Sequence, residues 1–309
     1  MDEDAEAMTG ELAEIVALND RAARFVDPRT IPTRFSLLKN MALSPAHYLE
    51  ACQRDQDDSI AARLARAHVG PDRSAALRFG TAAHAMLFGT GSVAVFRGPV
   101  RRGKAWEAFQ RMAAEDEHVE ILNEREHALA VEIVTAIRKH PTAMRLLFDG
   151  TIVETRIDWE WMGKACRSTP DARVPGKHVT DLKTCQSAQP EAFRRHALRL
   201  FYQAQASFYG TCLEEVGEPL PESFYVVAVE KARPFPVTVL RFTADAMELG
   251  AKLVRLWFER LQICEEANVW PVYAPSPAIV DLDIDHWGRD EEEAAGKVQL
   301  EIDGKKVAV

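Results

Sequence analysis

The sequence predicts an α/β fold with a large helical N-terminal section. Two observations predict it: residues 1–150 carry apolar side chains mostly at helical spacing, and from Thr151 onward strand patterns alternate with helix patterns. Of the 309 residues, 47% are hydrophobic, so the chain can bury a sizeable core. We expect a single domain over residues 1–290, with its α/β core at 151–270, followed by a charged, flexible tail at 291–309.

The helical section begins with a recognisable start signal. Ser44 and Pro45 predict a helix that runs through Ala51, because serine caps a helix N-terminus and proline fits its first turn. The pair His140-Pro141 indicates a break. Further helices are expected at 77–88, 104–116 and 123–139, where apolar residues recur at helical spacing.

The strand pattern is clearest at 151–161, where side chains alternate between two faces. A hairpin turn at 162–164 leads into a second strand that ends at Val174, and Pro175-Gly176 turns the chain into a third strand at 177–184. The remaining expected elements are a long helix at 189–215, strands at 224–231 and 237–242, and a helix at 244–267.

Charge and cysteine content narrow the classes of function. The net charge of −9 argues against a protein that coats nucleic acid through a basic surface, although an enzyme needs only a local basic track. None of the five cysteines lies in a C-x-x-C pair, which indicates free thiols in a reducing compartment and argues against a zinc ribbon or an iron–sulfur cluster. The acidic N-terminus and the lack of any run of about 18 apolar residues predict a cytoplasmic protein without a membrane span.

The residues with the clearest chemistry are Asp171, Asp181 and Lys183. Asp181 and Lys183 are two positions apart on an expected strand, so they share one face while Leu182 points into the core. Asp171 lies on the preceding strand, and neighbouring strands are about 4.8 Å apart. Two carboxylates that close repel unless a cation lies between them, and such oxygens suit Mg²⁺, with Mn²⁺ as a substitute. The alternative is an ordinary surface Asp–Lys pair, because D-x-K often occurs by chance.

Pro170-Asp171 followed by Asp181-Leu182-Lys183 resembles the complete PD-(D/E)XK nuclease signature. Aspartate stands at position 181 where many relatives have glutamate, and the superfamily admits both. The resemblance implies a restriction-endonuclease-like core, in which a mixed central sheet is flanked by helices.

Three further motifs resemble the RecB, RecE and lambda-exonuclease branch of this superfamily. Tyr202, Gln205 and Tyr209 match its Y-x-x-Q-x-x-x-Y helix, and their spacing places them on one helical face. Residues 79–84 resemble its G-x-x-x-H helix, and Glu154 occupies the place of its additional acidic residue. The order of the motifs indicates a RecE-type, exodeoxyribonuclease VIII-like protein of phage or prophage type.

The resemblance implies a role for each matching residue. Asp171, Asp181, the Leu182 carbonyl and His84 would bind the metal, and Glu154 would bind a second metal or its water. His84 alone could equally be a buried histidine of the helix core. Glu154 alone could lie on a solvated strand face.

Three more residues complete the implied site. Lys183 would orient and deprotonate the attacking water, while Gln205 and Tyr202 would hold this lysine or the scissile phosphate. Tyr202 and Tyr209 could instead be core aromatic residues. Gln205 is harder to explain as core, because it is polar among apolar neighbours.

Two groups of basic residues are candidates for binding DNA phosphates. The first is Arg101, Arg102 and Lys104, next to Trp106, and the second is Arg194, Arg195 and Arg199. The alternative for either group is a solvated helix face. No module that reads DNA sequence is visible, which favours cleavage without sequence preference.

The function that the resemblance implies is Mg²⁺-dependent exonuclease action on linear duplex DNA ends in phage-type recombination. It further implies 5′-to-3′ digestion, a RecT-type single-strand annealing partner and a ring-like homo-oligomer. An endonuclease acting on single-stranded or flap DNA would use the same metal centre. A catalytically inactive DNA-binding or assembly protein is a third possibility, and no glycine-rich loop or nucleophile elbow supports a small-molecule enzyme.

Overall fold

The computed structural model describes residues 27–65, 75–98, 101–113, 119–273, 299–302 and 305–308. The acidic N-terminus, residues 114–116 of one expected helix and most of the expected tail lie outside these ranges. Within the described residues, no helix is both long and apolar enough to cross a membrane.

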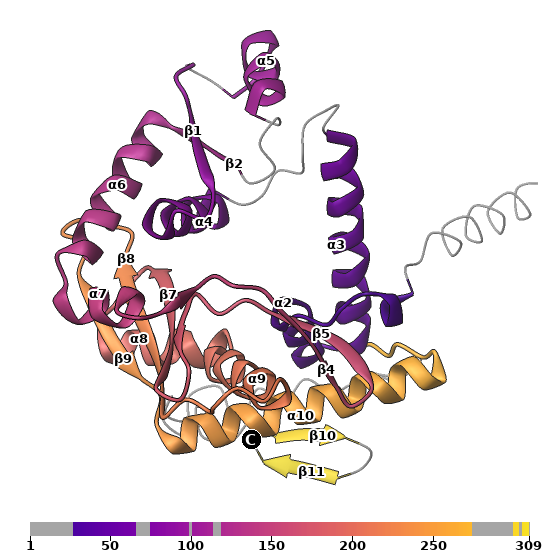
Figure 1. Cartoon of the computed structure of the whole chain (residues 1–309). Helices are drawn as coiled ribbons and strands as arrows, with labels where there is room; N and C mark the ends of the chain where they lie inside the picture. Colours follow the sequence, from indigo (N-terminus) through magenta and orange to yellow (C-terminus); the bar gives the residue numbers. More distant parts are fainter. Residues whose placement is uncertain are drawn as a thin grey trace, which may run out of the picture.

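A five-stranded mixed sheet forms the centre of the fold (Figure 1). Its strands, in spatial order, are β3 (Ile152–Val153), β6 (Ala172–Val174), β7 (His178–Cys185), β8 (Ser223–Glu230) and β9 (Val237–Arg241). Strands β7 and β8 are parallel, and the other neighbouring pairs are antiparallel.

Helices cover both faces of this sheet (Figure 1). One face packs against α4 (Ala75–Phe88), α6 (Glu124–Arg138) and α7 (Pro141–Phe148). The other faces α8 (Pro190–Arg199), α9 (Tyr202–Glu215) and α10 (Ala244–Ala267), with α2 (Phe35–Leu38) and α3 (Pro45–Ala65) joining the core beyond them. The prediction of a mixed central sheet flanked by helices is confirmed.

The alternation of side chains along β7 connects the two cores. Leu182 lies in the cluster with α4 and α6, while Val179 lies in the cluster with α9 and α10. Because successive residues of a strand point to opposite faces, Asp181 and Lys183 face the helices α8 and α9.

Several expected elements prove to be two elements each. The strand expected at 151–161 is divided into β3 and β4 (Ile157–Trp161), because Glu154 has left-handed backbone geometry with φ 38°. The second strand is divided into β5 (Lys164–Ser168) and β6. The helix expected at 189–215 is broken at Phe201, where φ is 58°.

Other boundaries also differ from expectation. The helix that begins at Pro45 continues to Ala65 rather than ending at Ala51. By contrast, the break expected at His140-Pro141 is confirmed: α6 ends at Arg138 and α7 begins at Pro141, where the His140 ring accepts a hydrogen bond from the Ala143 amide. Short helices η1 (Pro28–Thr30) and η2 (Lys39–Ala42) were not expected.

Two small sheets were also not expected. β1 (Ser92–Phe96) and β2 (Val119–Asn123) form a parallel pair beside α5 (Lys104–Ala113). Asn123 then starts α6 through a capping box with Glu126. β10 (Gln299–Ile302) and β11 (Lys305–Ala308) form an antiparallel hairpin inside the region expected to be a flexible tail.

Candidate active site

Strand β7 carries an ion pair between Asp181 and Lys183 near the first residue of α9. The Lys183 ammonium contacts the Asp181 carboxylate, and the two side chains are only 19% and 13% exposed. The ammonium also lies 4.9 Å from the centre of the Tyr202 ring, within the range of a cation–π contact. The lysine is therefore held in place by one charged and one aromatic neighbour.

Asp171 lies in the bend just before β6, next to Asp181 and Lys183. Its carboxylate accepts a hydrogen bond of 2.6 Å from the Leu182 amide, and its side chain is 13% exposed. Leu182 itself is 1% exposed, so the core fixes the backbone that Asp171 contacts. The hydrogen bond thus ties this carboxylate to a buried part of β7.

His84 extends from α4 to the same point of β7. Its Nε2 lies 3.0 Å from the Leu182 carbonyl oxygen, and its Nδ1 lies 3.4 Å from Glu154 Oε1 and 3.8 Å from Asp171 Oδ2. Ligand atoms of His84, Glu154 and Asp171 all lie within 4.8 Å of one another. Three elements far apart in the sequence therefore meet in one group that can bind a metal ion.

Charges in this group strongly influence one another. Burial and the charge of Asp181 raise the pKa of Asp171 to about 7. Burial works to lower the pKa of His84, but the charge of Asp171 and the hydrogen bond with Glu154 raise it to about 9. Burial likewise disfavours the charge on Lys183, yet Asp181 and Asp171 raise its pKa, so the ammonium stays protonated.

The donor set fits a divalent cation that prefers oxygen. Asp171, Glu154 and the Leu182 carbonyl supply oxygens of the kind that Mg²⁺ and Mn²⁺ bind, and His84 adds one nitrogen. In the structure, the His84 ring contacts the carbonyl oxygen that a cation would use. Asp181 is not part of the close group and is paired with Lys183 instead.

Comparison with known proteins identifies the family of this chain. A family model described as a PDDEXK-like domain of unknown function (DUF3799) matches residues 34–281, which is most of the chain. The chain belongs to this PDDEXK-like family. A search of curated proteins finds no match.

The fold of this PDDEXK-like chain is similar to that of a solved structure from Eubacterium rectale, described as a "Putative exonuclease". The match has a TM-score of 0.54 and 14% sequence identity, and it covers 82% of this chain and 90% of that one. A second match, to a protein called SSO0001, has a TM-score of 0.25 and 15% identity over 44% of this chain and 65% of that one, and it carries no argument. The first similarity shows the fold alone.

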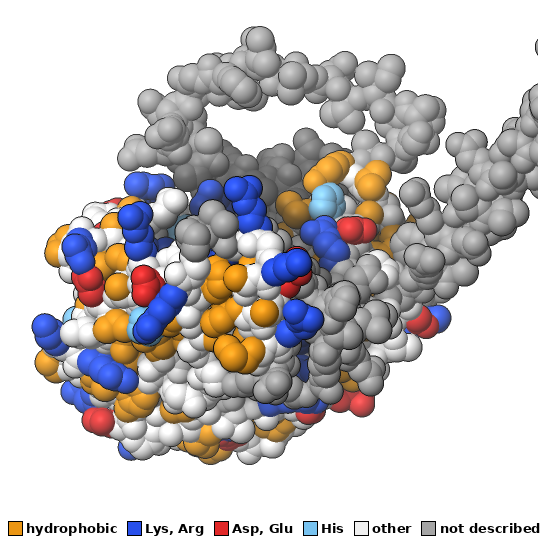
Figure 2. Space-filling view, turned by 90° about the horizontal axis from the view of Figure 1, so that it is seen from above, with side chains coloured by type: hydrophobic (Ala, Val, Ile, Leu, Met, Phe, Trp, Pro, Cys, Tyr) orange, Lys and Arg blue, Asp and Glu red, His pale blue; other side chains and the backbone are white. Residues whose placement is uncertain are grey.

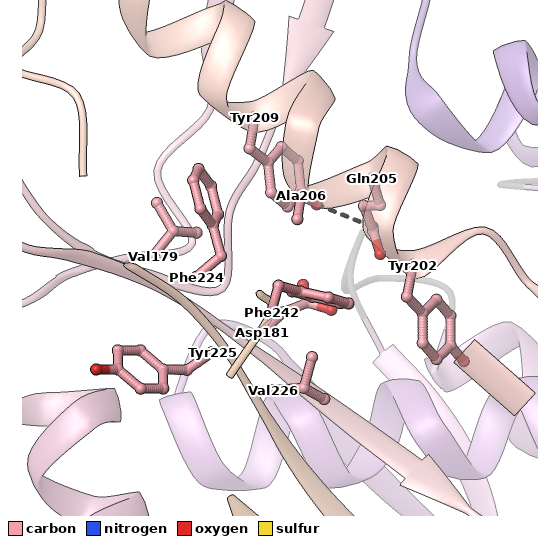
Figure 3. A pocket seen from close by; sticks show the side chains of 10 residues that line it. All are labelled: Val179, Asp181, Tyr202, Gln205, Ala206, Tyr209, Phe224, Tyr225, Val226 and Phe242. Carbon is pink, nitrogen blue, oxygen red and sulfur yellow. Dashed lines mark hydrogen bonds between the residues drawn. The ribbon is translucent and has the colours of Figure 1, made fainter. Parts of the chain in front are cut away.

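Beside Asp181, the PDDEXK-like domain has a small pocket (Figure 3). Tyr202, Gln205 and Tyr209 of α9 line one side of it, opposite Asp181 (Figure 3). Gln205 was expected to hold Lys183 or a phosphate. In the structure its amide nitrogen donates to the Tyr209 hydroxyl at 3.1 Å, which fixes the amide at the pocket wall.

In the first basic group, Arg101, Arg102 and Lys104, one of the three side chains forms contacts within the protein. Arg101 pairs with Glu126 and donates to the Ile121 carbonyl, so it supports the start of α6. Arg102 and Lys104 remain exposed. Two of the three expected phosphate contacts are thus available to a ligand.

The second basic group lies on α8, which leads directly into the helix of Tyr202. Arg194 pairs with Glu191, Arg195 is exposed, and Arg199 lies 3.4 Å from the His196 ring.

Figure 2 shows Lys and Arg side chains spread over one face of the molecule, with acidic side chains among them. The positive charge on that face is local rather than a continuous band.

Two residues at the site were missed by sequence reasoning. Thr90, just after α4, donates a hydrogen bond to Glu154, and no motif marks it. Local desolvation and the charge of Lys183 lower the pKa of Lys39, although Lys39 lies at the surface. No signal in the sequence connects Lys39 with Lys183, because the two residues are far apart along the chain.

Proposed function

We propose that this protein is a metal-dependent deoxyribonuclease. One observation carries the proposal: the metal-binding group of His84, Glu154 and Asp171 meets at Leu182, and the Asp181–Lys183 ion pair flanks Leu182 on the same strand. A cation site beside a fixed ammonium group suits the hydrolysis of a phosphodiester, because both positive charges stabilise the negative charge that develops on the phosphate oxygens.

The metal ion and the residues around it would have different roles in this hydrolysis. A bound Mg²⁺ or Mn²⁺ would polarise the phosphate and lower the pKa of a water molecule. Lys183 was expected to deprotonate the attacking water, but its raised pKa keeps it protonated. Its ammonium group instead donates hydrogen bonds that orient the attacking oxygen and stabilise the developing negative charge, and the proton that the water loses passes to bulk solvent. Tyr202 directs the ammonium, and the pocket wall at Gln205 positions the neighbouring phosphate.

We further propose that the substrate is the end of linear duplex DNA and that digestion runs 5′-to-3′. This part rests on the RecE-type motifs, as do the phage-type recombination role, the RecT-type partner and the homo-oligomer. The proposed cytoplasmic location rests on the scattered cysteines and on the lack of a long apolar run in the sequence. The family match supports the nuclease class, and the "Putative exonuclease" description of the structural relative is in keeping with attack on ends. Exposed Arg195 and Arg199 on α8 would contact the DNA backbone.

A cleavage assay tests the proposal. End-labelled linear duplex and closed circular DNA are incubated with Mg²⁺, with Mn²⁺ and with EDTA, using the wild-type protein, Lys183→Ala and Lys177→Ala. Lys177 is an exposed lysine in the turn before β7, so its variant is a matched control. We expect the linear DNA alone to be degraded, in a metal-dependent way, by the wild type and the control but not by Lys183→Ala.

Each other outcome has a defined meaning. Cutting of the circle would replace the exonuclease with the endonuclease. Cleavage that persists in EDTA would contradict the metal requirement. No cleavage of either DNA by folded wild-type protein, with both metals tried, would refute the nuclease and favour a DNA-binding protein.

A further inference from the structure

We propose that Thr90 is a positioning residue that fixes the Glu154 carboxylate for metal binding and thereby sets the affinity of the site. The inference rests on the metal site of the proposed function and adds to it a residue outside the motifs. It predicts that removing one hydroxyl group weakens divalent-cation binding while leaving the fold intact.

The hydrogen bonds of Glu154 are the first observation. The Thr90 hydroxyl donates to Glu154 Oε2, and the His84 ring lies 3.4 Å from the other oxygen, Oε1. Both carboxylate oxygens therefore have a partner from α4 or from the turn that follows it. Gly89 makes this turn with φ 73°, a conformation that glycine adopts without strain, and so brings Thr90 to the rim of the site.

The backbone of Glu154 is the second, independent observation. With φ 38° it is a non-glycine residue in the left-handed region, which is unfavourable and persists only where the surroundings enforce it. Its amide donates a hydrogen bond of 3.0 Å to the carbonyl of Asp171, another residue of the metal-binding group. The backbone thus aims the side chain, and Thr90 and His84 hold its end.

These two observations explain why Thr90 should matter for a bound cation. A glutamate side chain has three rotatable bonds, so a fixed backbone alone leaves the carboxylate free to turn away. A metal ion bound by His84 Nδ1 would take that atom away from Oε1, whereas the Thr90 hydroxyl holds Oε2 whichever ring nitrogen of His84 is used. Thr90 is then the partner that continues to hold the carboxylate when a cation binds.

Loss of a hydrogen bond to a ligand typically weakens metal binding by about 10–100-fold. We therefore expect Thr90→Val, which keeps the shape and removes the hydroxyl, to raise the Kd for Mn²⁺ by about tenfold or more. Thr90→Ser restores a hydroxyl and should return the Kd to within about threefold of the wild type, within the usual context dependence of such contacts.

The experiment measures Mn²⁺ binding to the full chain from the electron paramagnetic resonance signal of free Mn²⁺. Thr155→Val is the matched control, because Thr155 adjoins Glu154 but donates its hydroxyl to the Val153 carbonyl instead. Melting temperatures in EDTA accompany each titration. We expect weaker binding only in Thr90→Val, with a metal-free melting temperature like that of the wild type.

Three results would overturn the inference: wild-type affinity in Thr90→Val, equal weakening in Thr155→Val, or no rescue by Thr90→Ser. Absence of Mn²⁺ binding in the wild type would overturn it as well. The DNA cleavage assay tests the proposed nuclease function independently of this Mn²⁺ titration. A wild type that binds Mn²⁺ but cleaves no DNA would refute the nuclease and leave the role of Thr90 to be decided by the Kd values.

Discussion

Replacing Lys183 with methionine separates the chemistry of the site from its metal binding. Methionine retains an unbranched side chain against Tyr202 but removes the charge, so the variant leaves little cavity at a position that is only 19% exposed. Removing one preorganised hydrogen-bond donor from a developing negative charge lowers a rate by about 10²–10³-fold. The expected loss in the cleavage rate therefore corresponds to about 3–4 kcal/mol of transition-state stabilisation.

Metal binding should respond differently to this change. The positive charge of Lys183 acts to lower the pKa of both Asp171 and His84, so it disfavours any further positive charge on the metal-binding group. We expect Lys183→Met to bind Mn²⁺ at least as tightly as the wild type. Single-turnover cleavage of labelled duplex and a Mn²⁺ titration measure the two effects. A variant that keeps more than about a tenth of the wild-type rate, or that loses Mn²⁺ binding, would refute the separation of roles.

Three further predictions concern stability. Lys164→Met should lower the free energy of unfolding in urea by about 3–5 kcal/mol, because Glu265 is left buried without its cation. The double variant Lys164→Met with Glu265→Leu should recover most of this stability. A double variant that is less stable than Lys164→Met alone would contradict the pairing. Leu182→Ala should cost about 2–5 kcal/mol in the same titration, since this side chain is 1% exposed, and a loss below about 1 kcal/mol would show that the position is not tightly packed. The pKa of His84 is raised from 6.5 to about 9, so its stabilising charge is complete below pH 6.5 and is lost as the pH rises through 9. The metal-free protein should melt at a lower temperature at pH 9.5 than at pH 6.5, and an equal decrease in His84→Gln would contradict this assignment.

The sequence predicts the fold correctly where a pattern of residues is compatible with one kind of secondary structure only. The alternation along β7 predicts that Leu182 is buried while Asp181 and Lys183 share the opposite face, and the structure has this arrangement. The order of strands and helices after Thr151 likewise predicts the α/β core. The motif order brought His84 and Glu154 into consideration, and the structure places both beside Asp171.

The interruptions could not be predicted, because the patterns continue through them. Alternation runs unbroken from Val153 to Ile157, so nothing in the residue types marks the left-handed conformation of Glu154. Helical spacing similarly continues across Phe201, where α8 ends and α9 begins. Strands β1 and β2 are five residues each, and runs that short do not distinguish a strand from a helix.

The position of Glu154 links the metal-binding group to a distant part of the fold. The chain leaves the central sheet after β3 at Glu154 and returns to it before β6 at Asp171, and the bond between these two residues closes the base of the excursion. The hairpin of β4 and β5 is therefore a loop of sequence whose two ends are both potential metal ligands. The tip of this hairpin is held against α10, because Gln262 donates a hydrogen bond to the Met162 carbonyl and Glu265 pairs with Lys164. A substitution on α10 that loosens the hairpin would therefore act on the chain segment that joins the two carboxylates, although α10 itself lies outside the metal-binding group.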